Sequence, residues 1–236
     1  MLVRTNYNLN KGIGMQLKTI LNNVQNFKCF VYESVRLVDQ PSGARLEVQL
    51  RPRNNSRPTC SVCGKRGAGY DTLAARCFEF VPLWGIKVFF VYRPRRVDCR
   101  SCGVKVEQMP WVKGKSHRTE AYEWFLAGWA KRLSWKEVAE AFCTTWENVF
   151  RSVEMAVNWG RSHQDLTNIQ AIGVDEIKWQ RGHNYLTLVY QIDEHRKRLL
   201  WVGEKRTVKT LLRFFRWFGT ERSQALSYAC TDMWKP

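Results

Sequence analysis

The sequence has 236 residues, enough for one large domain or two to three small ones, and its 44% hydrophobic and 25% charged residues argue against disorder. Its 38 lysines and arginines against 21 aspartates and glutamates give a net charge of +17, which attracts polyanions and makes nucleic acid the leading partner class. The first residues lack the apolar core of a signal peptide, and no stretch approaches the roughly 18 uninterrupted apolar residues of a membrane span. We therefore expect a cytoplasmic protein with no membrane partner.

Two short cysteine motifs predict a structural zinc site. Cys60-Ser-Val-Cys63 and Cys99-Arg-Ser-Cys102 are two copies of one knuckle, each followed by a glycine that permits a tight turn. Because a reducing compartment does not favour a disulfide framework, this spacing points to a metal. Four thiolates satisfy tetrahedral Zn²⁺ and leave no position for water, so the expected role of the metal is folding rather than catalysis. The alternative is two unrelated pairs of buried thiols.

The insert between the two knuckles has the pattern of a β-hairpin. Residues 77–81 and 86–92 are apolar or alternate as strands do, and Trp84-Gly85 makes the turn between them. A hairpin would bring the second knuckle back to the first. Basic residues surround the knuckles, and among them we expect Arg95 and Arg96 to contact DNA phosphates.

From Thr119 onward, apolar residues recur at steps of three and four, which indicates helices. Ser134-Trp-Lys-Glu137 is a capping box that begins a short helix, and Thr144-Thr-Trp-Glu147 is a second box that begins a longer one. This layout is typical of a helix-turn-helix, whose second helix enters the major groove, although a helical hairpin that only packs has the same pattern. The expected base-reading residues are Thr145, Trp146, Asn148 and Arg151.

The carboxy-terminal third carries two aspartates in strand-like surroundings. Residues 169–178 form an apolar strand that contains Asp175, and a carboxylate there costs desolvation unless it is paired or binds a metal. Asp232 stands at the end of the last predicted strand. Between these two aspartates the pattern predicts strands over 185–192 and 199–202, a helix over 208–218 capped by Thr207, and a strand over 225–231.

Three antiparallel strands, a helix and a further strand resemble the opening of the ribonuclease-H-like fold, in which the first and fourth strands are neighbours. An aspartate from each strand can then face one point and share Mg²⁺ ions for phosphoryl transfer. Asp175 and Asp232 are therefore the candidate catalytic and magnesium-binding residues. Considered singly, each could instead be a turn cap.

The cysteine motifs, the capped helix pair, Ile-Gly-Val-Asp175-Glu and Thr-Asp232-Met-Trp-Lys-Pro together resemble the ISL-three family of DDE transposases from bacterial insertion sequences. The resemblance covers nearly the whole chain. It implies that Asp175 and Asp232 are the first two members of a D-D-E metal-binding triad. It also implies that the zinc finger and the helix-turn-helix bind the terminal inverted repeats of the element.

The sequence departs from this family at the third carboxylate, a glutamate on a helix beyond the fourth strand, which has no counterpart before Pro236. Glu176 is a poor substitute because strand alternation sends it to the opposite face from Asp175. Glu194 and Glu204 are expected to face solvent. The triad is therefore expected to be incomplete, and whether this chain is an enzyme by itself stays open.

These observations predict an α+β multidomain protein with a β-rich zinc finger, a helix-turn-helix and an incomplete ribonuclease-H-like α/β domain. The predicted function is that of an insertion-sequence transposase that binds double-stranded DNA and, when complete, cuts and joins it with Mg²⁺. The alternative is a truncated, inactive DNA-binding protein, and a zinc-ribbon transcription or RNA-processing factor ranks behind both. Expected protein partners are a second copy or a full-length transposase. The expected segments are 1–58 with a β-hairpin, 59–115 with the zinc finger, 116–165 with the helix-turn-helix, and 166–236 with the partial catalytic domain.

Overall fold

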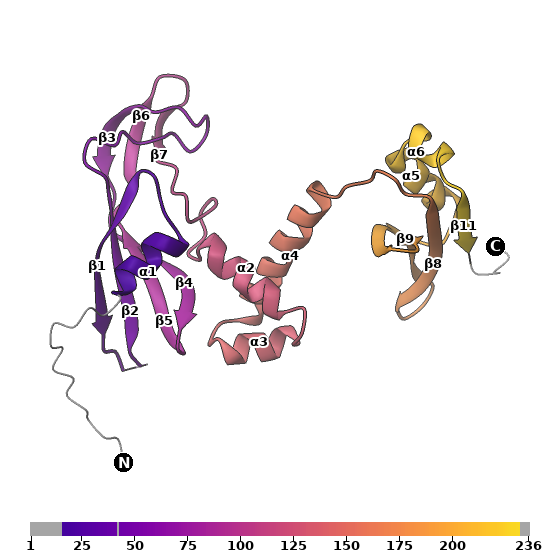
Figure 1. Ribbon diagram of the computed structural model, residues 1–236, viewed down its shortest axis with the longest axis horizontal. Coiled ribbons are helices and arrows are strands. Elements are labelled where there is room, and N and C mark those ends of the chain that lie inside the picture. The colour runs from indigo at the N-terminus through magenta and orange to yellow at the C-terminus, as the bar shows by residue number, and fades with distance from the viewer. Residues whose placement is uncertain (1–15, 42, 232–236) are drawn as a thin grey trace, which may run out of the picture. The chain divides into compact units, whose positions relative to one another are not determined.

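The computed structural model describes residues 16–41 and 43–231, and the chain divides into two compact units, Met1–Ser162 and His163–Pro236. The protein is mixed α/β, with six helices in the described ranges (Figure 1). None of the helices in those ranges is long and apolar enough to cross a membrane. Asp232, one of the two candidate carboxylates, lies outside the described residues.

The larger sheet of the first unit has the strand order β1-β2-β5-β4. The central pair β2 and β5 is parallel, and the two outer pairs are antiparallel. β4 and β5 form the hairpin expected from the sequence, and Trp84 and Gly85 at its turn both have positive φ, as a tight two-residue hairpin requires. The strands are β1 (Phe30–Val38), β2 (Arg45–Pro52), β4 (Arg76–Leu83) and β5 (Ile86–Tyr92).

An aromatic core fills one side of this sheet. Its centre is Trp111, which is fully buried and packs edge-on against Phe30, Phe78 and Tyr92. Helix α1 (Leu17–Val24) adds Leu21 to the same core. The alternation in β5, which buries Val88, Phe90 and Tyr92, explains why this insert folds as a strand with one core-facing side.

A second, smaller sheet has the order β3-β6-β7 and is antiparallel throughout. Its strands are β3 (Ala68–Thr72), β6 (Arg95–Cys99) and β7 (Gly103–Val106). The two cysteine motifs adjoin it, because β6 ends at Cys99 and β7 begins directly after Cys102. The hairpin between the knuckles therefore completes the larger sheet, while the strands next to the knuckles form this smaller one.

Three helices follow in the first unit, namely α2 (Glu120–Trp129), α3 (Trp135–Ala141) and α4 (Trp146–Ser162). They bury a common core that includes Leu126, Val138 and Val149. The capping box of Ser134 and Glu137 is present as expected. The expected second box is wrong by one residue, because Thr145 rather than Thr144 caps α4 and accepts from the Asn148 N–H (3.3 Å).

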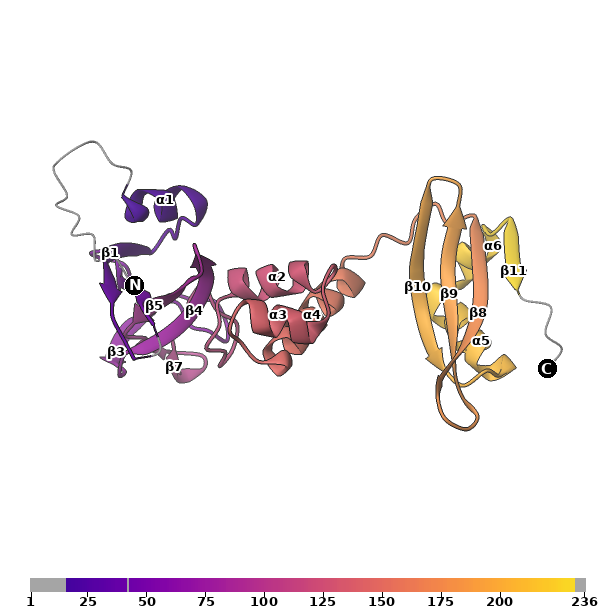
Figure 2. The same ribbon diagram turned by 90° about the horizontal axis from the view of Figure 1, so that it is seen from below.

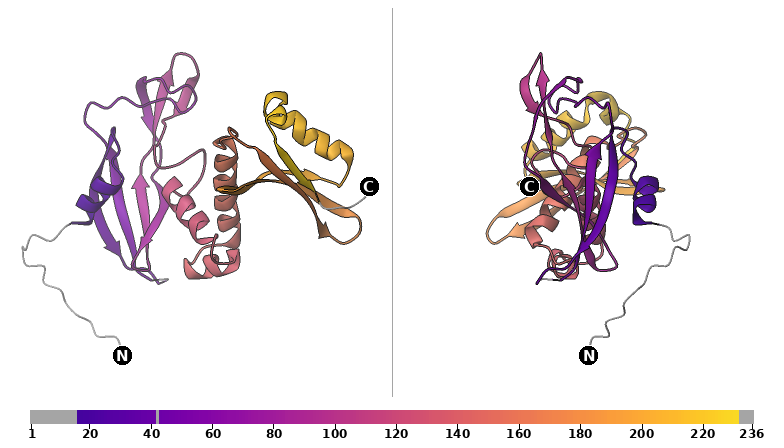
Figure 3. Two further views of the ribbon diagram at one scale, coloured as in Figure 1. Left: turned by 45° about the vertical axis from the view of Figure 1, so that its right-hand side comes forward. Right: turned by 90° about the vertical axis from the view of Figure 1, so that its left-hand side faces the viewer.

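The second unit is a four-stranded sheet of order β10-β9-β8-β11 with helix α5 across one face (Figures 2 and 3). β9 pairs antiparallel with both β8 and β10, and β11 pairs in parallel with β8. Phe214 and Phe218 of α5 pack on Ile172, Val189 and Leu200 of the sheet. The elements are β8 (Ala171–Gln180), β9 (Asn184–Asp193), β10 (Arg196–Glu204), α5 (Val208–Phe218), α6 (Thr220–Gln224) and β11 (Tyr228–Thr231).

Candidate metal centre and nucleic-acid interface

The four cysteines of the two knuckles come together in the first unit. The ligand atoms of Cys60, Cys63, Cys99 and Cys102 all lie within 4.8 Å of one another, and the Sγ atoms of Cys63 and Cys99 are 3.5 Å apart. A tetrahedral zinc with bonds of about 2.3 Å to sulfur separates its ligands by roughly 3.8 Å. The donor set and its spacing therefore fit a four-thiolate zinc ion.

Tight turns and backbone N–H groups prepare the thiols for a metal. Gly64 and Gly103 follow the knuckles with φ of 69° and 71°, a conformation that favours glycine. The N–H groups of Cys63 and Val62 point at Cys60 and lower the pKa of its thiol to about 7. A hydrogen bond with Cys63, together with burial, raises the pKa of Cys102 to about 12. Metal binding would displace the protons that such a cluster retains.

The first knuckle is joined to the small sheet by backbone hydrogen bonds. The Ser61 N–H donates to the Val106 carbonyl of β7 (3.4 Å), and the Gln108 N–H, just after β7, donates to the Thr59 carbonyl (2.7 Å). Gly67 lies so close to β6 that a Cβ atom there would stand 2.7 Å from the Asp98 carbonyl oxygen. Strand pairing therefore holds the two halves of the cluster together.

Arg95, a predicted phosphate contact, is held by hydrogen bonds to other groups of the protein. Its guanidinium donates to both carboxylate oxygens of Glu107 (2.7 and 3.0 Å to Oε2, 3.2 Å to Oε1) and to the Ser56 carbonyl (2.7 Å). The Tyr92 hydroxyl also donates to Glu107 (2.5 Å), and burial with this bond raises the pKa of Tyr92. Sequence reasoning missed Glu107, whose side chain is only 1% exposed. Glu107 directly follows β7, and nothing in the sequence around it indicated that it would be the buried partner of Arg95.

Arg96, the second predicted phosphate contact, lies at the surface of the small sheet. Its Nε donates to Asp71 Oδ1 (2.6 Å), and its guanidinium stacks over the Tyr70 ring (5.1 Å to the centroid). The hydrogen bond to Arg96 lowers the pKa of Asp71. Arg96 is therefore a surface cation that already has an acidic partner.

The turn between α3 and α4 is anchored to the larger sheet. Cys143 adopts a left-handed conformation (φ 48°), and its carbonyl accepts a hydrogen bond from Lys87 Nζ of β5 (2.7 Å). Arg118 donates to Asn148 Oδ1 (2.6 Å), and the Asn148 amide donates to Thr144 (3.0 Å). Sequence reasoning missed Arg118 and Lys87, because only the folded chain brings them to this turn.

The four predicted base-reading residues differ in how available they are. Trp146 is 61% exposed at the start of α4, and Thr145 and Arg151 are exposed as well. Arg151 forms an ion pair with Glu147 one turn earlier on the same helix (2.6 Å). Asn148 is half-buried, and both its amide oxygen and its amide nitrogen form hydrogen bonds within the protein. Its side chain therefore orients the start of α4 and does not project into solvent.

Asp175 lies near the middle of β8, opposite Leu188 of β9. It is exposed, so the desolvation cost expected from the sequence does not arise, and its Oδ1 accepts from the Glu176 N–H (2.7 Å). Ile172 and Val174 of β8 belong to the core beneath α5, and strand alternation places Asp175 on the other face. Glu176 falls on the opposite face from Asp175, as expected.

The parallel pairing of β11 with β8 brings the end of β11 beside the middle of β8. Thr231, the last described residue, is paired with Val174, which directly precedes Asp175. Asp232 follows Thr231 in the sequence and lies outside the described residues. Within the described ranges, the only group of three or more candidate metal ligands is the cysteine cluster.

Comparisons with known proteins bear on both units. Residues 172–236 match the model of the ISL3-type DDE family described as "Transposase". The chain is 29% identical over 198 residues to the transposase for insertion sequence element IS1557 of two Mycobacterium tuberculosis strains, covering 82% of this chain and 44% of that protein. It is 22% identical over 217 residues to the transposase for insertion sequence element IS1001 of Bordetella parapertussis, covering 92% of this chain and 52% of that protein. The chain thus spans about half the length of these relatives, and no solved structure is significantly similar to it.

Proposed function

This chain belongs to the ISL3 family of insertion-sequence transposases, and from that premise we propose that it binds the terminal inverted repeats of its element and contributes two carboxylates to DNA cleavage and joining. In this proposal the first unit recognises double-stranded DNA, and the second carries part of a ribonuclease-H-like catalytic site. The net charge of +17 supports a polyanionic partner.

The observation that carries the catalytic part is the parallel pairing of β11 with β8, inside the segment that matches the transposase family. Two strands that are far apart in sequence are neighbours in the sheet. β8 carries Asp175 near its middle, and Asp232 directly follows β11 in the sequence. An exposed carboxylate such as Asp175 suits a hard cation that also contacts phosphate oxygens. We therefore propose Asp175 and Asp232 as magnesium ligands. The chemistry that bound Mg²⁺ supplies is activation of a water or a 3′-hydroxyl and stabilisation of the leaving oxygen.

For DNA recognition we propose that α3, the Cys143 turn and α4 act as a helix-turn-helix, with α4 in the major groove. Trp146 and Arg151 are the exposed candidates for base contact, and Thr145 can reach a phosphate or a base. Asn148 and Arg118 hold the first turn of α4 in place. Arg96 would contact a DNA phosphate in place of its present partner, the Asp71 carboxylate. Arg95, in contrast, supports the small sheet through its ion pair with Glu107.

For the cysteine cluster we propose a structural Zn²⁺ held by Cys60, Cys63, Cys99 and Cys102. The ion would join two knuckles that are distant in sequence and would stabilise the three-stranded sheet between them. Because all four positions are filled by protein thiolates, it has no role in the cleavage step.

The test is binding of the purified, zinc-loaded chain to labelled duplexes of its own terminal repeat and of a scrambled sequence, followed by a strand-cleavage assay with Mg²⁺. We expect a clear preference for the repeat. If cleavage occurs, Asp175→Asn should abolish it, while Glu176→Gln, the same charge change on the opposite face of β8, should retain it. Equal affinity for the two duplexes across a salt series would overturn the recognition proposal.

The second candidate is a DNA-binding protein without cleavage activity of its own. It is favoured because, within the described ranges, Asp175 belongs to no group of three or more candidate metal ligands. Preference for the repeat without cleavage, unchanged by Asp175→Asn, would support this candidate. Such a protein could pair with a second copy or with a full-length transposase, and mixing it with the full-length protein in the cleavage assay tests that pairing.

A further inference from the structure

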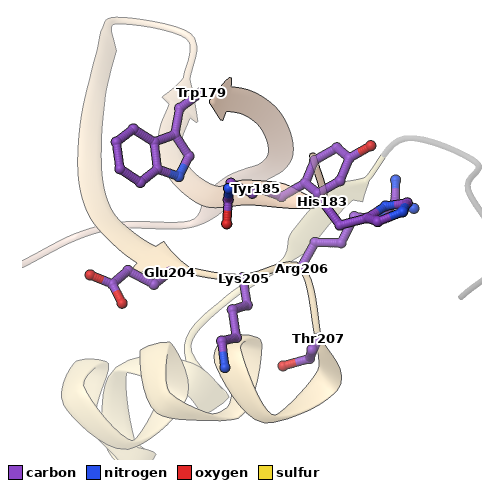
Figure 4. A pocket seen from close by; sticks show the side chains of 8 residues that line it. Trp179, His183, Tyr185, Glu204, Lys205, Arg206 and Thr207 are labelled. Atoms are coloured by element: carbon purple, nitrogen blue, oxygen red, sulfur yellow. The ribbon is translucent and has the colours of Figure 1, made fainter. Parts of the chain in front are cut away.

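One end of the carboxy-terminal sheet is hollowed by a cavity of about 360 Å³, which we call the Trp179 pocket. It lies where the β8–β9 hairpin meets the end of β10 and the start of α5 (Figure 4). Trp179, His183 and Tyr185 line it from the hairpin, and Lys205 and Arg206 line it from the other side. The pocket contains none of the residues assigned above to metal binding or recognition.

The Trp179 pocket offers aromatic surfaces to a ligand. Trp179 is 54% exposed, whereas Trp201, Phe214, Phe215 and Phe218 belong to the core of this unit. The Arg206 guanidinium lies over the Tyr185 ring, 4.3 Å from its centroid. An exposed indole and a guanidinium stacked on a ring are flat surfaces of the kind on which unpaired bases stack.

The lining of the Trp179 pocket is also positively charged. Lys205 and Arg206 outweigh the single acid of the lining, Glu204. The backbone fixes Lys205 in a left-handed conformation (φ 71°), because its N–H donates to the Tyr185 carbonyl (2.8 Å) and its carbonyl accepts from Thr187 (2.9 Å). The amino-terminal end of α5, which Thr207 caps, adds a further positive potential. Such a combination suits a phosphate beside a base.

The pocket and Asp175 are connected by a single strand. Trp179 follows Asp175 by four residues on β8, which at about 3.3 Å per residue places them roughly 13 Å apart. One strand of B-form DNA carries a phosphate about every 3.4 Å along the helix axis. A DNA strand whose phosphate lies at Asp175 can therefore reach the pocket with about four nucleotides.

We propose that the Trp179 pocket binds one unpaired nucleotide of the DNA strand that passes Asp175, with its base stacked on Trp179 and its phosphate held by Lys205 and Arg206. The inference rests on the proposed function, because it takes DNA as the ligand of this unit. It adds a preference for DNA ends with single-stranded character, which a helix-turn-helix and a zinc finger do not supply.

The test uses the full chain and two forms of the terminal-repeat duplex, one blunt and one with a short unpaired 3′ overhang that contains 2-aminopurine. We expect the overhang to bind more tightly than the blunt end and its fluorescence to be quenched on binding. Trp179→Ala should lower the affinity for the overhang by roughly 5- to 100-fold and remove the quenching, as expected for the loss of one stacked base. Trp179→Phe should retain part of both effects.

Matched controls separate stacking from general attraction. Lys197→Ala removes the same charge as Arg206→Ala but lies at the other end of β10, so only Arg206→Ala should weaken overhang binding more than blunt binding. Trp84→Ala removes an exposed indole from the β4–β5 turn and should leave overhang binding unchanged. Equal losses on both duplexes, or quenching that survives Trp179→Ala, would overturn the proposal. Failure of the proposed function has a different signature, in which the blunt repeat is not preferred over a scrambled duplex.

Discussion

Glu107 stands out among single residues because its charge is buried beneath the small sheet of the first unit. Three groups compensate it, namely the Arg95 guanidinium, the Arg95 N–H and the Tyr92 hydroxyl. Tyr92 belongs to β5 of the larger sheet and Arg95 to β6 of the smaller one, so this carboxylate joins the two sheets. Arg95 therefore contributes to stability, whatever it contributes to DNA binding.

Arg95→Met should destabilise the first unit by about 3 kcal/mol, because it leaves the Glu107 charge buried without its ion-pair partner. The lower end of the range for such pairs is expected, since 17% of the Arg95 side chain is exposed. Chemical denaturation measures the change. Arg96→Met, the neighbouring substitution in an exposed pair, should change the free energy of unfolding little. The idea fails if the two variants unfold alike, or if adding Glu107→Gln to Arg95→Met recovers none of the loss.

At the scale of elements, the helix pair is held at a fixed position on the larger sheet. Thr119, the cap of α2, donates to the Glu79 carbonyl of β4 (3.0 Å), and Lys87 of β5 reaches the Cys143 carbonyl in the turn before α4. Lys87 also forms an ion pair with Glu79 (3.3 Å). With this positioning, the proposed recognition helix α4 would lose little conformational freedom on binding DNA.

Arg151→Ala should lower the affinity for the terminal repeat by roughly 5- to 100-fold, the loss expected for one base-reading arginine. Lys136→Ala is the matched control. Lys136 forms an exposed ion pair with Glu140, one turn away on the same helix, as Arg151 does with Glu147, but its helix is α3. Lys136→Ala should change the affinity little. Fluorescence anisotropy with repeat and scrambled duplexes measures both. A loss that is equal on the two duplexes would make Arg151 a phosphate contact rather than a base reader.

Zinc removal should affect the two sheets of the first unit differently. The small sheet has only a minor core, around Val97 and the cysteines, whereas the larger sheet has its own aromatic core. Chelation should therefore increase amide hydrogen exchange in β3, β6 and β7 more than in β1, β2, β4 and β5. Elemental analysis should find one zinc per chain, lost in Cys99→Ser and retained in Cys143→Ser. Uniform exchange on chelation would contradict this account.

Elements with a local signal were the most predictable from the sequence. The helix from Val208 to Phe218, its Thr207 cap and its end at Gly219 follow from residues within a single stretch, and so does the Trp84-Gly85 turn. The cap of α4 was misplaced because two threonines stand side by side, and only the hydrogen bond to Asn148 distinguishes them. Helix α6 was not expected, because five polar-rich residues carry no apolar period.

Long-range contacts were less predictable, with one exception. The pairing of β11 with β8 was expected from the order of elements, since that order resembles a known fold. The partner of the β4–β5 hairpin was not expected, because the pattern of a strand does not say which strand lies next to it. The contacts of Arg95 were also missed, since a sequence shows the charge of an arginine but not a distant acid. Zinc and magnesium binding remain predictions.

For the whole molecule, the net charge of +17 should make ionic strength the main variable in the proposed DNA binding. If 6 to 10 phosphates are neutralised, the affinity for a scrambled duplex should fall roughly 10³- to 10⁵-fold between about 50 and 200 mM salt. The preference for the terminal repeat should persist over this range, because base contacts displace few counterions. Titrations at several salt concentrations measure the slope. A nearly flat dependence would exclude the phosphate backbone as the main source of affinity.

The strand order of the larger sheet has a consequence for the chain as it leaves the ribosome. β1 and β2 can pair as soon as they emerge, but the other edge of β2 must wait for β5, which is made only after the first knuckle, β3 and β4. At roughly 5 to 20 residues per second, that edge stays open for several seconds. An open edge is a template for strands of other chains. Synthesis from many messages at once therefore favours aggregation of nascent chains, and slower initiation should improve the yield of folded protein.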